Sequence, residues 1–448
     1  LLIYTNKTLK LEIYNMNLIK KFLKHALVIA ILSYPVYNLL HHVHVLNPLE
    51  KELADFKFTD IYFGHIQETI LDTNIYLLDI SHKDNEITRS EISDFINNVN
   101  KKYKPKVIAI DVEFLMDTSV SDDVNARLVN SLLNDNIVLA YNLINKGQWI
   151  KNRSELPFNY NIVEEGFTNN LVAKADFGVE RFFKPSIIQG NDTLKHFSVV
   201  TAENYGSNFE KLLLREDNKV MINFKYKYND AISIGDTSEY FKLKDKIVIV
   251  GLFTKNNKGY PFYNEDLHYT SSNKVYLGKS PPNMYGGEVL ATIISNINDN
   301  TFVKYYKSLS SWLNIIFSIF IYLNLLYFMG KSHNIFAATS IITQFGLVSL
   351  FVFLSVFFVA QFNFYLDLTL LGIIAFFSVE FIGVIEEFIG LAESKIIPLA
   401  KRFSFIKTND KVHVSNCSAI SKSSGVQCRN KTKGGNMYCR VHNKKKTS

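Results

Sequence analysis

The chain has 448 residues, of which 47% are hydrophobic and 14% aromatic, and its formal net charge is +7. That charge is local, because nine Lys or Arg and no acidic residue follow Asp410, which leaves a net charge of −2 on the rest of the chain. The charge balance therefore excludes a nucleic-acid-binding surface spread over the whole chain, and the length allows two or three folded units.

The first apolar stretch covers residues 22–46 and lies beside Lys20 and Lys21. Its apolar heart is short and holds Pro35, which a signal peptide would explain. A signal peptide is the alternative, but no small-residue cleavage site follows, so we predict an uncleaved anchor after a cytoplasmic segment, 1–21. Met16 precedes the stretch, and we expect residues 1–15 to lie upstream of the native start.

Between residues 47 and 308, short runs of Val, Ile and Leu alternate with helical patterns. The strand-like runs are 74–80, 106–114, 136–144, 219–226 and 245–253, and the helix-like segments are 91–103, 122–135 and 285–298. Continuous β-branched runs are typical of strands buried on both faces of a parallel sheet, with helices as crossovers. We therefore predict an α/β domain with a mainly parallel sheet and an irregular insertion near 145–195.

Three further apolar stretches follow this domain, at 311–330, 335–360 and 364–385. Each has about the 20 residues that a membrane-crossing helix needs. Buried core helices of a soluble protein are the alternative, which the middle stretch disfavours because it carries no charge. With the first stretch, the sequence predicts four transmembrane helices.

Lys and Arg residues predict how these helices are oriented, because they concentrate on the cytoplasmic side. Lys331 lies between the second and third stretches, none lies between the third and fourth, and Lys395, Lys401 and Arg402 follow the fourth. The pattern predicts a multi-pass membrane protein with both termini in the cytoplasm and residues 47–308 outside. Residues 386–410 are then a cytoplasmic juxtamembrane helix or linker.

All three cysteines of the chain lie in the last segment, 411–448, and a histidine follows the last of them closely. They are Cys417, Cys428, Cys439 and His442. Three thiolates and an imidazole suit one tetrahedral Zn2+, and the reducing cytosol keeps thiols available. The metal would supply about 10–16 kcal/mol to a segment too polar to fold around its own core. Free thiols in a disordered tail are the alternative.

This basic tail has three candidate partners. Anionic membrane lipids would attract it by about 1 kcal/mol per charge near the surface. Nucleic acid is disfavoured, because Tyr438 is the one aromatic residue among the basic ones. The third candidate is a cytosolic protein that docks on the zinc-bound module.

Candidate ligand-binding residues lie at the carboxyl ends of predicted strands, where open α/β sheets bind ligands. Asp79, Asp111 and Glu113 occupy such ends, and Arg89 opens the following helix. The alternative is structural, since an Asp at a strand end often caps the next helix and Arg89 can pair with it.

A second candidate site lies in the sequence EDLHYTSS, where Asp266, His268 and Thr270 would form a polar or metal-assisted site. The alternative is a hydrogen-bonded loop that fastens the sheet edge. No set of residues in the sequence has the pattern of a catalytic site, so we do not expect an enzyme.

Several segments, taken in order, resemble the second CHASE family, an extracellular sensory domain of bacterial receptors. They are DIYFGHIQ, NIYLLDI, TRSEISDFI, PKVIAIDVEF and DDVNARLVNSLLNDNIVLA in the first half, and VMINF, LKDKIVIVGLF, EDLHYTSS and PPNMYGGEVLATIISNI in the second. The resemblance covers roughly residues 47–305. It implies a bacterial inner-membrane receptor, with dimerisation as in many such receptors. The tail resembles a short Cys-Cys-Cys-His family seen on bacterial and phage proteins.

The cytoplasmic end departs from this family, which usually carries a kinase or cyclase there. The sixty or so residues after the last span are too few for such a domain. We therefore predict a membrane-bound sensor of an extracytoplasmic signal that relays it to a separate cytosolic partner. The main alternative is a structural or assembly protein of the cell envelope whose outside domain binds a protein partner constitutively.

Overall fold

The computed structural model describes residues 56–81, 87–115, 119–156, 163–171, 178–208, 219–253, 266–274, 282–329, 333–369, 371–372, 375, 415–416 and 431–432. The chain divides into two compact units, Leu1–Ile382 and Gly383–Ser448. Within the second unit, β19 (Ser415–Asn416) pairs antiparallel with β20 (Lys431–Thr432). The predicted segments 1–21, 22–46 and 386–410 and the four candidate zinc ligands lie outside the described residues.

The first unit contains a seven-stranded sheet in the order β13-β2-β14-β3-β4-β5, in which β6 also pairs with β4. The strands are β2 (Ile75–Asp79), β3 (Val107–Ile110), β4 (Ile137–Asn145), β5 (Trp149–Asn152), β6 (Glu164–Phe167), β13 (Ile232–Ser233) and β14 (Ile247–Gly251). All pairings are parallel except that of β5 with β4. The predicted α/β fold with a mainly parallel sheet is therefore confirmed.

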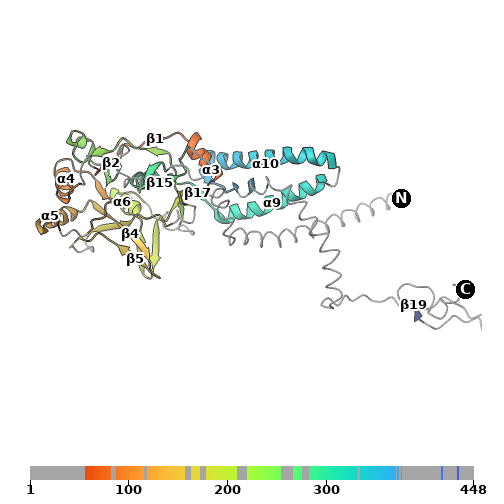
Figure 1. Ribbon diagram of the computed structural model, residues 1–448, viewed down its shortest axis with the longest axis horizontal. Coiled ribbons are helices and arrows are strands. Elements are labelled where there is room, and N and C mark those ends of the chain that lie inside the picture. The colour runs from red at the N-terminus through yellow and green to blue at the C-terminus, as the bar shows by residue number, and fades with distance from the viewer. Residues whose placement is uncertain are drawn as a thin grey trace, which may run out of the picture. The chain divides into compact units, whose positions relative to one another are not determined.

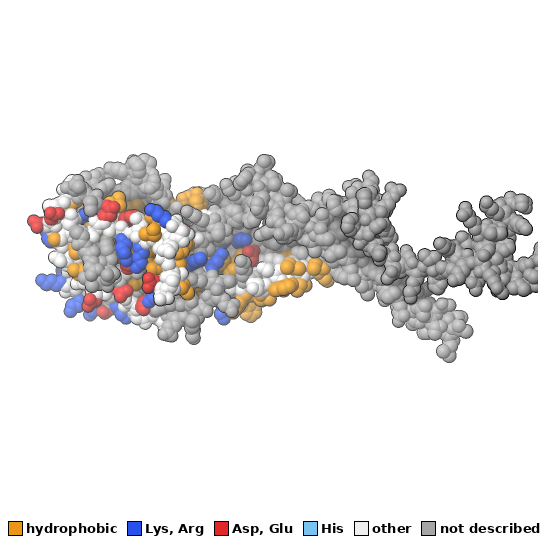
Figure 2. All heavy atoms as spheres, turned by 90° about the horizontal axis from the view of Figure 1, so that it is seen from below, with side chains coloured by type: hydrophobic (Ala, Val, Ile, Leu, Met, Phe, Trp, Pro, Cys, Tyr) orange, Lys and Arg blue, Asp and Glu red, His pale blue; other side chains and the backbone are white. Residues whose placement is uncertain are grey.

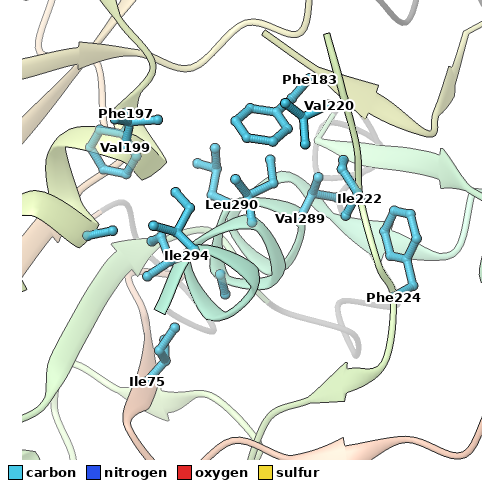
Figure 3. Close-up of a cluster of buried hydrophobic side chains, with 14 of the residues drawn as sticks. Ile75, Phe183, Phe197, Val199, Val220, Ile222, Phe224, Val289, Leu290 and Ile294 are labelled. Carbon is cyan, nitrogen blue, oxygen red and sulfur yellow. The ribbon is translucent and has the colours of Figure 1, made fainter. Parts of the chain in front are cut away.

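Helices cover both faces of this sheet (Figure 1). One face packs against α4 (Arg89–Lys102) and α5 (Asp122–Leu132), and the other against α6 (Phe197–Tyr205) and α8 (Gly286–Asp299). Successive side chains of a strand point to opposite faces, so Ile108 joins the first core and Val107 the second. Figure 3 shows the second core, where side chains of α8 and α6 meet around Leu290 and Ile294.

Local capping explains where these helices begin. Thr88 and Glu91 form a capping box at α4, which satisfies the first free N–H groups of the helix. His196 caps α6, because its Nδ1 accepts a hydrogen bond from Ser198 N at 3.2 Å. Burial lowers the pKa of His196 to about 3, so the ring is neutral and able to accept this bond.

Smaller sheets and one 3-10 helix complete the domain. They are β1 (Ile70–Leu71) with β12 (Tyr226–Lys227), β8 (Phe182–Phe183) with β11 (Val220–Met221), β9 (Ser186–Gln189) with β10 (Asp192–Lys195), β15 (Leu267–Thr270) with β7 (Val179–Glu180) and β16 (Met284–Tyr285), and η5 (Thr237–Leu243).

The prediction of one parallel strand over residues 219–226 is wrong. Only Val220–Met221 form β11, which pairs antiparallel with β8, and Tyr226 belongs to β12. The interruption falls at Asn223, whose N–H donates to Asn296 Oδ1 at 2.7 Å while its carbonyl accepts from Asn296 Nδ2 at 2.9 Å. A side chain of α8 thus takes the backbone groups that a neighbouring strand would use.

Two long apolar helices follow the domain and lie side by side, α9 (Lys307–Met329) and α10 (His333–Phe362) (Figure 1). They contain the predicted spans 311–330 and 335–360, except for Gly330. Among the described residues, Ile342–Phe362 is long and apolar enough to cross a membrane, and Ser308–Ile321 is a shorter apolar segment. Figure 2 shows hydrophobic side chains gathered along this part, whereas charged side chains are spread over the α/β domain.

The predicted span 364–385 begins too early. Phe364–Tyr365 form strand β18, which pairs in parallel with β17 (Lys304–Tyr305) at the end of the domain. Asn363, with φ 51°, turns the chain there, and its side chain donates to Phe302 O at 3.0 Å. These bonds fasten the turn after α10 to the domain, so a span can begin only beyond it.

Near its start, the described chain forms a short helix that continues into a π-helix. These are α3 (Phe58–Ile61) and η2 (Tyr62–Ile66). Asp60 in α3 forms an ion pair with Arg181, whose side chain is 1% exposed. α3 also contacts α10, so it lies where the domain and the apolar helices meet.

Candidate functional site

The carboxyl ends of β2, β14 and β3 lie side by side because these strands are neighbours in the sheet. Asp79 ends β2, and its Oδ1 accepts hydrogen bonds from Ser81 N at 3.0 Å and Phe253 N at 3.1 Å. Phe253 follows β14, so Asp79 ties the ends of two strands together. These contacts fit the structural alternative for Asp79 rather than a free ligand-binding carboxylate.

Asp111 follows β3 and is the most perturbed acid at this edge. Its backbone N–H donates to Val250 O at 2.9 Å, which fixes the residue beside β14. Burial, with a smaller contribution from the charge of Asp266, raises the pKa of Asp111 to about 7. A carboxyl group with such a pKa changes its charge near neutral pH, a property found at functional sites.

His268 lies between two further acids. Its Nδ1 is 3.2 Å from Glu180 Oε1, and its Nε2 is 3.8 Å from Asp266 Oδ1. These two carboxylates, Asp266 above all, raise the pKa of His268 to about 9, so the ring is positively charged at neutral pH. We call Asp111, Glu180, Asp266 and His268 the edge cluster.

A glycine at the start of α8 makes room for this cluster. A Cβ at Gly286 would lie 2.7 Å from Asp266 Oδ1 and 3.2 Å from His268 Nε2. Gly286 N also donates to Asp266 O at 3.0 Å, which holds the β15 segment against the helix. The Gly-Gly pair of the sequence YGGEV is thus explained in part by the close approach of the edge cluster.

A small polar pocket opens next to Asp111, beyond the ends of β3 and β6 and beside the middle of β4 and the end of β5. Its cavity volume is about 30 Å³, and we call it the edge pocket. Its lining consists of carboxylates, amides and hydroxyls with two aliphatic residues: Asp111, Val112, Glu113, Ala140, Tyr141, Asn142, Asn152 and Thr168. A cavity of about 30 Å³ is roughly the size of one water molecule, so the edge pocket has room for one small polar group of a solute rather than for a drug-sized molecule.

The structure brings together only some of the residues predicted from the sequence. Asp111 and Glu113 line the edge pocket, where Glu113 Oε1 accepts from Asn152 Nδ2 at 3.1 Å. Arg89 is bonded elsewhere, to Asn125 Oδ1 at 2.5 Å and to the carbonyl of Leu115, which joins the starts of α4 and α5. Thr270 bonds with Asn283 and Ser272, which fits the fastening role proposed as an alternative.

In the part of the chain that the structure describes, no group of three or more His, Cys, Asp and Glu side chains is placed to hold a metal ion. A metal-assisted site at Asp266 and His268 is therefore not supported there. The arrangement instead offers hydrogen-bond acceptors and donors beside a charged imidazole. It can bind a small polar molecule and respond to its charge.

Sequence analysis missed Glu180 because it lies in the irregular insertion, outside any periodic pattern. Its neighbourhood carries one signal that would have found it, the charged pair Glu180–Arg181 inside the apolar sequence VERFF. Charges within an apolar run are costly unless paired, and both residues are indeed buried with partners of opposite charge.

Comparison of the sequence with protein families finds a match to the CHASE2 domain over residues 27–326. This match agrees with the family resemblance inferred from the sequence. Neither the curated proteins nor the solved structures contain a match to the chain.

Replacing His268 with Gln tests whether the edge cluster is held by charge. Because the pKa of His268 is raised from 6.5 to about 9, its charge stabilises the fold fully below pH 6.5, and this contribution is lost as the pH rises through 9. After discounting for exposure, we expect His268→Gln to lower the free energy of unfolding by about 1 kcal/mol at pH 6. The difference should vanish near pH 10, as urea unfolding of the purified protein would measure.

His65→Gln is the matched control, because the His65 ring bonds the backbone carbonyl of Lys274 at 2.9 Å. Its effect should differ little between the two pH values. An equal loss for His268→Gln at both pH values would contradict the charge assignment.

Proposed function

We propose, from the premise that the chain belongs to the CHASE2 domain family, that this protein is a membrane-bound sensor of an extracytoplasmic signal. CHASE2 domains are extracellular sensory domains of signalling proteins, and the match over residues 27–326 is the observation that carries the proposal. The α/β domain detects the signal, and a separate cytosolic partner receives it.

The edge pocket is the proposed site of detection. It lies at the carboxyl end of parallel strands, and its polar lining contains Asp111, whose pKa is near neutral. A solute that binds there would contact β3, β4 and β6 together. Its charge would also act on the edge cluster, because Asp111 belongs to both the pocket and the cluster.

We infer that α9 and α10 lie in a membrane, as two of four spans. Large apolar side chains are exposed along both helices, which water would not favour over so long a stretch. Those more than half exposed are Trp312, Ile315, Ile316, Phe320, Ile342, Phe345, Phe353 and Phe362. The first and fourth spans, near 22–46 and after Asp367, rest on the sequence.

Two independent observations support the proposed orientation of these helices in the membrane. Lys331, in the segment that joins α9 and α10, favours a cytoplasmic position. The other ends of both helices are bound to the domain, since β17 precedes α9 and pairs with β18 beyond α10. This hairpin supports an outside position for the domain and cytoplasmic termini in a bacterial inner membrane.

The tail is proposed to fold around one Zn2+ held by Cys417, Cys428, Cys439 and His442. The spacing of these residues supports the proposal, as does the pairing of Asn416 with Lys431 on either side of the segment that contains Cys417 and Cys428. The basic residues around it would bind a cytosolic protein or the anionic membrane surface.

A thermal-shift screen of small polar solutes on the purified full chain tests the sensory site. A solute at 100 times its Kd stabilises the protein by about 2.7 kcal/mol, which raises Tm by roughly 5 to 11 °C. We expect Asp111→Asn to reduce that rise and Asp192→Asn, an exposed position in β10, to leave it unchanged. If no solute raises Tm and one protein always co-purifies, the constitutive envelope role is favoured instead.

The orientation can be tested with single cysteines, after the three native ones are replaced with Ser. Ser121→Cys at the start of α5 should react with a membrane-impermeant maleimide in intact spheroplasts. Ser332→Cys should react only after the membrane is permeabilised. Equal labelling of both positions in intact spheroplasts would contradict the four-span arrangement.

Elemental analysis of the purified protein tests the metal site. Wild type should carry one zinc per chain and Cys428→Ser none, since losing a thiolate removes much of a binding free energy of about 10–16 kcal/mol. Ser424→Ala is the control that keeps all four ligands. Absence of zinc from wild type would leave a basic tail without a metal.

A further inference from the structure

Two consecutive residues connect the edge cluster with the start of the membrane helices. Glu180 lies against His268 in the edge cluster, and Arg181 forms the ion pair with Asp60 in α3. We propose that this Glu180–Arg181 link carries a change at the edge cluster directly to α3 and to the helices that α3 contacts. This proposal rests on the proposed sensory function.

The first half of the link is the contact of Glu180 with β15. Glu180 ends β7, which pairs in parallel with Tyr269 and Thr270 of β15, next to His268. Its side chain is 6% exposed and also accepts a hydrogen bond from Asn170 Nδ2. Glu180 therefore follows any displacement of His268, because it is bound to that strand by both backbone and side chain.

The second half is a two-bond ion pair. Arg181 Nε is 3.0 Å from Asp60 Oδ1, and its terminal nitrogen is 2.6 Å from Asp60 Oδ2. Paired bonds of this kind fix the relative orientation of the two groups as well as their distance. Because both partners are buried, neither can separate from the other without leaving an uncompensated charge.

α3 in turn contacts the segment that follows α10. Lys57 Nζ is 3.2 Å from Asp367 Oδ2, and Phe58 N donates to Thr369 Oγ1 at 3.4 Å. The Phe58 ring lies so close to Gly372 that a Cβ there would be 2.5 Å from it. A shift of α3 thus acts at once on the turn where the fourth span is proposed to begin.

The change of helix type between α3 and η2 also fits a hinge at this point. The α-helical turn of α3 changes at Tyr62 into the π-helix η2, and Gln67 N donates to Tyr62 O at 2.8 Å across it. π-Helical turns are rare and are found frequently at functional sites.

Hydrogen exchange of the full chain in lipid nanodiscs, with His268→Gln as the perturbation, tests the link without any solute. Peptides that cover 57–67 should exchange about tenfold faster in His268→Gln than in wild type. In the double variant Asp60→Leu/Arg181→Met, which replaces both charges by apolar groups, His268→Gln should no longer change this exchange.

Lys195→Gln is the control, because it breaks a partly exposed ion pair with Glu203 on α6. Slow exchange of peptides containing β3 shows that each variant is folded. If these peptides exchange fast in the double variant, Arg181→Lys is used in its place. No change in 57–67 on His268→Gln, or the same change in the link-broken background, would overturn the proposal. If no solute raises Tm but His268→Gln speeds the exchange of 57–67 as expected, the proposed sensory site is rejected and the link is retained.

Discussion

The burial of β14 between β2 and β3 is the constraint on which the rest of the domain depends. All five of its residues are buried, and it pairs with a neighbour along both edges. Its Ile and Val side chains alone contribute roughly 6 to 12 kcal/mol before entropy costs, comparable with the net stability of a whole domain. Because β14 cannot leave the sheet, the strand ends that carry Asp79 and Asp111 are held on either side of it.

Helix α8 packs on one face of this sheet and spans the domain from the edge cluster to the end beside α9 and α10. Its first residue, Gly286, contacts Asp266 and His268, while Asn296 near its end bonds the backbone of Asn223. Asn223 Nδ2 also donates to Thr301 O, close to the turn after α10. In the part of the chain that the structure describes, the edge cluster is therefore connected to the end beside α9 and α10 by a long path through α8 and by a short ionic path through Glu180 and Arg181.

The sheet could be predicted because β-branched runs report burial on both faces, and Asp111 because it follows such a run. The strand over 219–226 could not, since its interruption depends on a side-chain amide from α8 that no local pattern reveals. Glu180 was missed for a related reason. Its role depends on pairing with β15, which lies some ninety residues later in the chain, and the insertion that contains it has no period of its own.

Polar contacts at the end of the domain beside α9 and α10 join several segments of the chain to one turn. Three contacts meet at the turn after α10. Lys57, just before α3, forms an ion pair with Asp367, and Lys304 N in β17 donates to Asn363 O. Asn314 Nδ2 in α9 donates to Asp367 O. These contacts join the start of α3, the strand before α9, α9 itself and the turn after α10 to one another. Under the proposed sensory function, a change that reaches this end would therefore act on these segments together rather than on one helix alone.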